Sequence, residues 1–190
     1  GAMRIRNSNG SEISGNTVRD NLRGIRFQDS HNGSIHDNVS YNNFESGIYL
    51  AAGSYTGADG CSNTDVYDNE VYGNRNNGLL SIGGIGNTFT NNNVHDNWNS
   101  GVQLWSPADI TIKNNTISDN NTYSFNGIGN GGDASGGVSA SNSYNGPNGN
   151  AEFGFKLDNN DISSNGRDGT FTGVYVNIAL SNTISNNSFE

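Results

Sequence analysis

Four short segments begin with glycine and then alternate apolar residues with residues that could contact a ligand. They are Gly24-Ile-Arg-Phe27, Gly47-Ile-Tyr-Leu50, Gly101-Val-Gln-Leu104 and Gly173-Val-Tyr-Val176. Successive side chains of a β-strand point to opposite faces, so the apolar residues would face a core and the others solvent. The same rule turns Gln28 and Leu80 outward. The candidate ligand-binding residues on this outward face are Arg26, Tyr49, Gln103, Trp105, Tyr175 and Asn177.

These residue types suit recognition of an extended polysaccharide. Aromatic rings pack against the C–H groups of sugars, whereas amides and arginine bind hydroxyls and carboxylates. The alternative interpretation is an ordinary exposed sheet face, because scattered exposed aromatic side chains are normal on proteins. The leading hypothesis is therefore a polysaccharide-binding module, and the alternative is a sheet face without a ligand.

Catalysis has fewer candidates on this face. A hydrolase would need paired carboxylates, and the outward positions contain none. Asp29, Asp109 and Asp133 follow in turns, where Asp is favoured for its backbone conformation. A uronan lyase or C5-epimerase would need a base and a group that neutralises the uronate carboxylate. Tyr49 and Arg26, about one coil spacing apart, form the candidate catalytic pair.

No His/Cys cluster has the spacing of a zinc site. The histidines are expected to be structural or solvent-facing; they are His31, His36 and His95. The sequence indicates no cofactor firmly, although carboxylates and backbone carbonyls are the ligands that calcium prefers. The acidic candidates for such a calcium site are Asp59, Asp68 and Glu70.

The elements that must position these residues come from a repeat in which an apolar residue is followed three positions later by Asn. Its first apolar column is Ile13, Ile35, Val66, Phe89, Ile112, Leu157 and Ile184, with Asn16, Asn38, Asn69, Asn92, Asn115, Asn160 and Asn187. The second column is Val18, Val39, Val71, Val94, Ile117, Ile162 and Phe189, with Asn21, Asn42, Asn74, Asn97, Asn120 and Asn165. The glycine column is Gly24, Gly47, Gly78, Gly101, Gly127 and Gly173.

Each apolar cluster is too short for a helix and fits a very short strand. The first column mostly advances by 22 or 23 residues, as from Ile13 to Ile35 or from Val66 to Phe89. Three strands per repeat predict an all-β fold, a single-stranded right-handed parallel β-helix of about seven coils. Equivalent side chains would then stack about 4.8 Å apart, and Asn side chains could hydrogen-bond from coil to coil.

Longer spacings mark insertions, at about 51–63 and 129–151. The second insertion could contain a degenerate coil around Val138, but the Asn spacing is missing there, and we expect a surface excursion. Residues 1–3, Gly-Ala-Met, look like a cleavage scar from an expression tag. We therefore expect one β-helix domain over residues 4–190.

Composition limits the partners. The chain has 190 residues and a net charge of −9, without a basic stripe, so no nucleic acid is expected as a partner. No apolar run reaches the length of a membrane span, so no membrane insertion is expected. A single cysteine, Cys61, excludes an internal disulfide.

The Asn-rich repeat and the glycine-led strands resemble the right-handed parallel β-helix of the pectate-lyase-like superfamily. The repeats are most similar to those of bacterial mannuronan C5-epimerases and periplasmic copper-accessory proteins. The resemblance implies that the glycine-led strands form the floor of a substrate groove. The epimerase signature Asp-Pro-His-Glu is absent, because the only prolines are Pro107 and Pro147, and neither precedes histidine.

Three function classes remain open from the sequence. The first is a polysaccharide-recognising module, the second a polysaccharide-modifying lyase or epimerase, and the third a structural or adhesin segment of a larger surface protein. The expected location is extracellular or at the cell surface, with the bacterial periplasm as the alternative. Because solenoids need capped ends, the lack of recognisable caps predicts end-to-end self-association.

Overall fold

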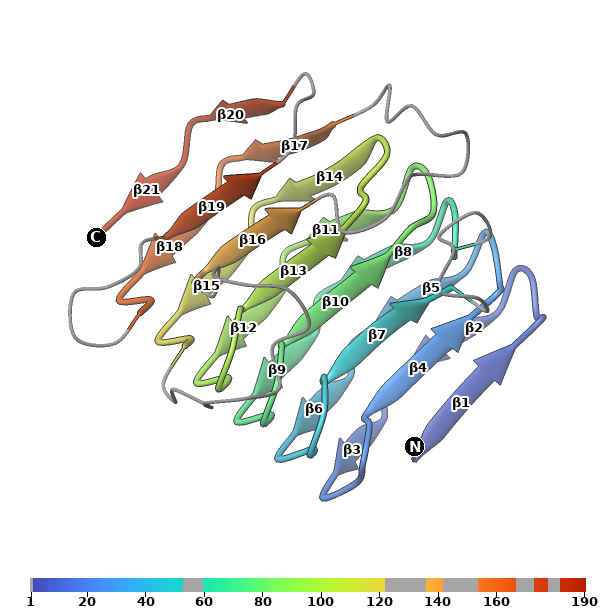
Figure 1. Cartoon of the computed structure of the whole chain (residues 1–190). Helices are drawn as coiled ribbons and strands as arrows, with labels where there is room; N and C mark the ends of the chain where they lie inside the picture. The colour runs from blue at the N-terminus through green and yellow to red at the C-terminus, as the bar shows by residue number, and fades with distance from the viewer. Residues whose placement is uncertain (1, 53–59, 122–135, 142–153, 167–172, 178–181) are drawn as a thin grey trace.

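The computed structural model describes residues 2–52, 60–121, 136–141, 154–166, 173–177 and 182–190. Every regular element within these ranges is a β-strand, and the strands form three parallel sheets of seven strands each (Figure 1). The chain visits the three sheets in turn and then advances by one coil. This confirms the predicted right-handed parallel β-helix of about seven coils.

The sheets, named A, B and C, have the following strands. Sheet A contains β1 (Met3–Arg6), β4 (Ile25–Gln28), β7 (Ile48–Ala51), β10 (Leu79–Ile82), β13 (Val102–Trp105), β16 (Val138–Ser141) and β19 (Val174–Asn177). Sheet B contains β2 (Glu12–Ser14), β5 (Ser34–His36), β8 (Asp65–Tyr67), β11 (Thr88–Thr90), β14 (Ile110–Lys113), β17 (Phe155–Asp158) and β20 (Thr183–Ser185). Sheet C contains β3 (Thr17–Arg19), β6 (Val39–Tyr41), β9 (Glu70–Tyr72), β12 (Asn93–His95), β15 (Thr116–Ser118), β18 (Asp161–Ser163) and β21 (Ser188–Phe189).

The first apolar column is confirmed as the inner row of sheet B. Ile13 pairs with Ile35, Ile35 with Val66, and the row continues in the same register to Ile184. Its members are buried from Ile13 to Leu157. Burial of this apolar surface, repeated in all three sheets, supplies the main driving force for coil stacking.

The first Asn column is confirmed as a continuous hydrogen-bonded ladder between sheets B and C. Each Asn donates its Nδ2 to the Oδ1 of the next Asn at 2.9 to 3.0 Å, from Asn16 to Asn187. Each Oδ1 also accepts the backbone N–H of the preceding Asn, as Asn92 does from Asn69 at 3.1 Å. These bonds satisfy buried polar groups at a corner where the strand ladders are interrupted.

The second Asn column is also a ladder, but its second member is Asn43 rather than the predicted Asn42. Asn21 donates its backbone N–H to Asn43 Oδ1, and Asn43 Nδ2 donates to Asn74 Oδ1 at 2.9 Å. Ser40, not Val39, therefore occupies the inner position of β6, opposite Val18. Asn42 lies at the corner before Asn43 and has a left-handed backbone conformation, with φ 52°, as Gly73 does at the same corner of the next coil.

The glycine column follows from packing at the entrance to sheet A. A Cβ on Gly78 would lie 2.4 Å from Val94 Cγ1, and one on Gly101 would lie 2.5 Å from Ile117 Cγ2. The inner side chain of sheet C packs directly against this backbone, so only glycine fits.

Gly137, not the predicted Gly127, continues the glycine column and accepts the backbone N–H of Val102 at 2.8 Å. Gly127 lies outside the described residues. The expected surface excursion over 129–151 is wrong at Val138–Ser141, because β16 pairs with both β13 and β19. Apart from residues 136–141, that insertion lies outside the described residues.

The ends of the 51–63 insertion are part of the coil. Ala51 closes β7, and Cys61 is buried with its thiol donating to the Phe27 carbonyl oxygen at 3.1 Å. Desolvation in this apolar setting raises the pKa of the Cys61 thiol. Met3 belongs to β1 and pairs with Ile25, one residue before the expected domain start.

Candidate functional site: the outer face of sheet A

The outer face of sheet A carries two parallel rows of side chains that run along the helix axis. The strand register places them one coil apart. The first row is Arg4, Arg26, Tyr49, Leu80, Gln103, Ser139 and Tyr175. The second row is Arg6, Gln28, Ala51, Ile82, Trp105 and Ser141, and the backbone register continues it to Asn177.

Cationic and aromatic groups meet at the N-terminal end of this face. The Arg26 guanidinium carbon lies 5.3 Å from the centre of the Tyr49 ring, and the two residues are register partners on β4 and β7. Arg4 donates from Nη2 to Gln28 Oε1 at 2.8 Å. Stacking on an aromatic face fixes the orientation of a guanidinium.

A carboxylate borders the same end. Asp29 lies in the turn after β4, with φ 48°, and pairs through Oδ2 with Arg6 Nε at 3.3 Å. Its Oδ1 is buried and has no hydrogen-bond partner within the described part of the chain. Asp109 is exposed in the equivalent turn after β13, and Asp133 lies outside the described residues.

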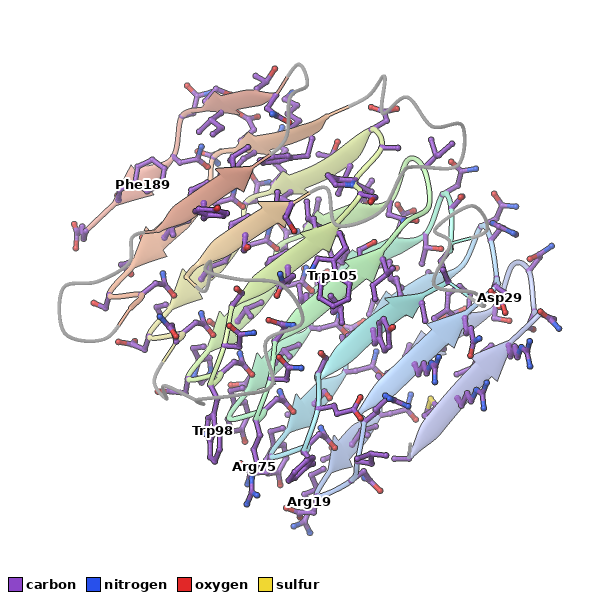
Figure 2. The ribbon with its side chains drawn as sticks, in the orientation of Figure 1. Arg19, Asp29, Arg75, Trp98, Trp105 and Phe189 are labelled. Carbon is purple, nitrogen blue, oxygen red and sulfur yellow. The ribbon has the colours of Figure 1, made fainter. Side chains whose placement is uncertain are left out.

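The middle of the face is apolar and the far end is polar. Leu80 is 7% exposed and Ile82 is 4% exposed, so both are buried although they lie on the outer face. Gln103 and Trp105 follow on β13 and are half-buried, and Figure 2 shows Trp105 on the face of sheet A. Tyr175 continues the first row on β19, while Asn177 is placed by its backbone register alone.

Sequence reasoning missed the contribution of β1. Arg4 and Arg6 extend the two rows by one coil beyond Arg26 and Gln28. Met3-Arg-Ile-Arg6 repeats the pattern of Ile25-Arg-Phe-Gln28 after 22 residues, and that match was the available signal. Gln28 points outward, as predicted, but it is only 3% exposed because of its position in this cluster beside Arg4.

The calcium candidates do not form a cluster in the described residues. Asp68 and Glu70 flank the buried Asn69, whereas Asp59 lies outside the described ranges. Among the residues that the structure describes, no group of three or more His, Cys, Asp or Glu side chains could hold a metal ion. The described residues also contain no helix long and apolar enough to cross a membrane.

Sheets B and C carry stacked rings on their outer faces. His36 of β5 stacks on Tyr67 of β8 at 4.6 Å between centroids, and Tyr72 of β9 stacks on both Tyr41 and His95. Burial among these neighbours raises the pKa of Tyr67 and Tyr72.

His36 is also bracketed by two carboxylates. Its Nδ1 lies 2.7 Å from Asp37 Oδ2, and its Nε2 lies 3.2 Å from Glu12 Oε1. The hydrogen bond with Asp37 is the main cause of a raised His36 pKa, and the bond with Glu12 acts in the same direction. Protonated His36 therefore pairs with a carboxylate of its own coil and with one of the preceding coil.

Comparison with known proteins matches the whole chain to one family model. The model, described as "Right handed beta helix region", matches residues 1–80 and 57–190. Among curated proteins, none matches the chain by sequence.

Three solved structures with a similar fold are named as epimerases of mannuronan or alginate and as a pectate lyase. The Azotobacter vinelandii mannuronan C-5 epimerase AlgE4 A-module is 20% identical, with a TM-score of 0.67 over 96% of this chain and 53% of its own. The periplasmic alginate epimerase AlgG is 16% identical, with a TM-score of 0.67 over 98% of this chain and 43% of its own. Pectate lyase Pel9A is 16% identical, with a TM-score of 0.60 over 92% of this chain and 52% of its own. This chain thus spans about half the length of each.

Proposed function

The chain belongs to the right-handed β-helix family, and on that premise we propose that it recognises a polysaccharide along the outer face of sheet A. The ligand would be an extended glycan whose sugars follow the two rows, because the rows run parallel to the helix axis. The residues proposed to bind it are Arg26, Tyr49, Gln103, Trp105, Tyr175 and Asn177.

The observation that carries this proposal is the pairing of Arg26 with Tyr49, 5.3 Å apart, at one end of a row that also presents Gln103. A guanidinium held against a ring can bind a sugar carboxylate, and ring and amide can contact the uncharged part of the sugar. The names of the epimerases and the lyase of similar fold support an acidic polysaccharide as the class of ligand.

Affinity electrophoresis through gels that contain alginate, pectate or a neutral glycan tests the proposal. Tyr49→Ala and Trp105→Ala should each weaken retention by about 1 kcal/mol, roughly fivefold, because each loses an aromatic contact. Tyr67→Ala, on the outer face of sheet B, is the matched control and should leave retention unchanged. Unchanged retention of both sheet A variants would refute the site.

A second candidate function is catalysis on a uronan, as a lyase or C5-epimerase. It is favoured by the same Arg26–Tyr49 neighbours, which would neutralise a carboxylate and supply a base, and by the fold shared with such enzymes. Two features weigh against it. The sequence lacks the Asp-Pro-His-Glu signature, and the carboxylate nearest the Arg26–Tyr49 end of this face, Asp29, is paired with Arg6.

Ultraviolet absorbance of unsaturated uronide ends would reveal a lyase, and proton NMR of polymannuronate after incubation would reveal an epimerase. Activity that disappears in Tyr49→Phe would establish the enzyme. Retention on the gels without lyase or epimerase activity would support the binding module. Absence of both retention and activity would favour a structural or adhesin segment. A periplasmic location is proposed from the name of the periplasmic alginate epimerase of similar fold. An extracellular or cell-surface location and end-to-end self-association stay predictions.

A further inference from the structure

A second ligand-binding feature lies in the turn that leads from sheet C to sheet A. Phe44, Arg75 and Trp98 follow Asn43, Asn74 and Asn97 of the second ladder in three consecutive coils. Their backbone N–H groups donate to the Asn one coil back, which fixes the three residues in one column. Figure 2 shows Arg75 and Trp98 at the edge of the molecule near β9 and β12.

The guanidinium of Arg75 is held between two rings. Its carbon lies 5.4 Å from the centre of the Phe44 ring and 5.1 Å from the Trp98 ring. Arg75 is exposed and Phe44 is 54% exposed, so the stack projects into solvent. Rings on both faces of a guanidinium leave its N–H edge as the part that can bind another group.

That edge is unoccupied in the described part of the chain. Three other arginines, Arg6, Arg19 and Arg23, form ion pairs with Asp29, Asp20 and Glu45 respectively. Arg75 has neither an ion pair nor a side-chain hydrogen bond among the described residues, in a chain whose net charge is −9. The contacts with the two rings stabilise this cation without using its N–H groups.

The neighbouring column supplies amides. Asn76 and Asn99 follow Arg75 and Trp98 by one residue and lie half-buried beside them, with Asn99 Nδ2 donating to Asn76 Oδ1 at 3.1 Å. A planar cation, exposed ring surface and amides are the groups that bind a carboxylate, the C–H face of a sugar and its hydroxyls.

We propose that the Phe44–Arg75–Trp98 stack is a second glycan-binding site, specific for a sugar that carries a carboxylate. Arg75 binds the carboxylate through its N–H edge, and Trp98 and the adjacent amides contact the sugar ring. This site is separate from the outer face of sheet A and does not depend on ligand binding there.

Fluorescence of Trp98 tests the proposal directly, because the chain has two tryptophans and Trp105→Phe leaves Trp98 as the only one. The variant also carries Arg26→Gln and Tyr49→Ala to remove the proposed sheet A contacts. Oligogalacturonate should change the Trp98 emission in a saturable way. The carboxyl-reduced form of the same oligomer should bind about tenfold more weakly or worse.

In the same background, Arg75→Gln should abolish the change, and Arg75→Lys should weaken binding about tenfold because it keeps the charge but loses the planar, ring-stacked fork. Circular dichroism confirms that each variant is folded. An emission that does not respond to oligogalacturonate, or responds equally in Arg75→Gln, would overturn the proposal. An equal response to polyglutamate would overturn the assignment to a sugar and indicate an acidic peptide instead.

Discussion

The corner ladders and the outer face of sheet A are built by the same coils, but they repeat to different degrees. In the ladder from Asn16 to Asn187 the same amide makes the same hydrogen bonds in every coil. On the outer face the side-chain type changes along the axis, from Arg26 through Leu80 to Tyr175.

This difference in repetition separates two roles: the ladder residues hold the coils together, and the outward residues of sheet A form the surface that a ligand could contact. A buried amide that is not hydrogen-bonded costs free energy, so every coil is constrained to keep its Asn. An outward side chain has no such constraint, and its variation along the axis can match a ligand. We therefore expect substitutions in the Asn ladders to lower the free energy of unfolding and to leave the ligand contacts intact. Substitutions on the outer face of sheet A should weaken ligand binding and leave stability unchanged.

The largest loss of stability is expected at the centre of the first ladder. Asn92→Ala removes the acceptor of Asn69 and the donors to the Val66 carbonyl and Asn115 Oδ1. The orphaned buried groups should lower the free energy of unfolding by about 3 kcal/mol or more. Asn93→Ala, the exposed neighbour, should change it by less than about 0.5 kcal/mol. Equal urea midpoints for the two variants would contradict the ladder's role.

Gly78→Ala should lower stability by a smaller amount. The new Cβ would lie 2.4 Å from Val94 Cγ1 and 2.8 Å from the Gly101 carbonyl oxygen, so the coil must shift. Overpacking of this kind typically costs about 1–3 kcal/mol. Chemical denaturation measures it, and a variant as stable as the parent would show that the entrance to sheet A tolerates a side chain.

On the outer face, Arg26→Gln should change binding and not stability. Loss of the charge should weaken binding to an acidic oligosaccharide about tenfold and reduce its salt dependence, because a charge-assisted hydrogen bond is lost. Arg19→Gln removes an arginine of sheet C that already pairs with Asp20, and it should bind like the parent. Calorimetric titration compares them, and equal losses would indicate nonspecific attraction by net charge.

The smallest expected effect concerns pH. The folded-state pKa of His36 is raised by Asp37 and Glu12, so protonated His36 stabilises the fold. This contribution is fully present below the ordinary histidine value of about 6.5 and is lost as pH rises through the raised value. His36→Gln should flatten the change in melting temperature between about pH 6 and pH 8. An unchanged pH dependence in His36→Gln would contradict this contribution.

The repeating part of the molecule was predictable because the hydrogen-bonded ladders require Asn at a fixed spacing in the sequence. The separation between the two ladders is five residues in every coil, as from Asn38 to Asn43, and that constancy identifies Asn43 where an apolar residue at Val39 suggested Asn42. Ser40 hid the register, since a polar residue occupies an inner position and donates to the Gly47 carbonyl oxygen.

Features without the Asn spacing escaped prediction. Long insertions separate strand β16 from Asn120 and Asn160 of the ladders, and β1 precedes the first ladder, so the Asn spacing does not place either strand and their pairing does. The same holds for the Phe44–Arg75–Trp98 stack, because its residues share a column but no residue type.

A crystal structure with a bound acidic oligosaccharide tests the central claim most directly. The account predicts sugar density along the two rows of sheet A, parallel to the helix axis, with a carboxylate on Arg26 and a ring against Tyr49 or Trp105. Density confined to sheets B or C, or a sheet A face left bare at saturating ligand, would contradict it.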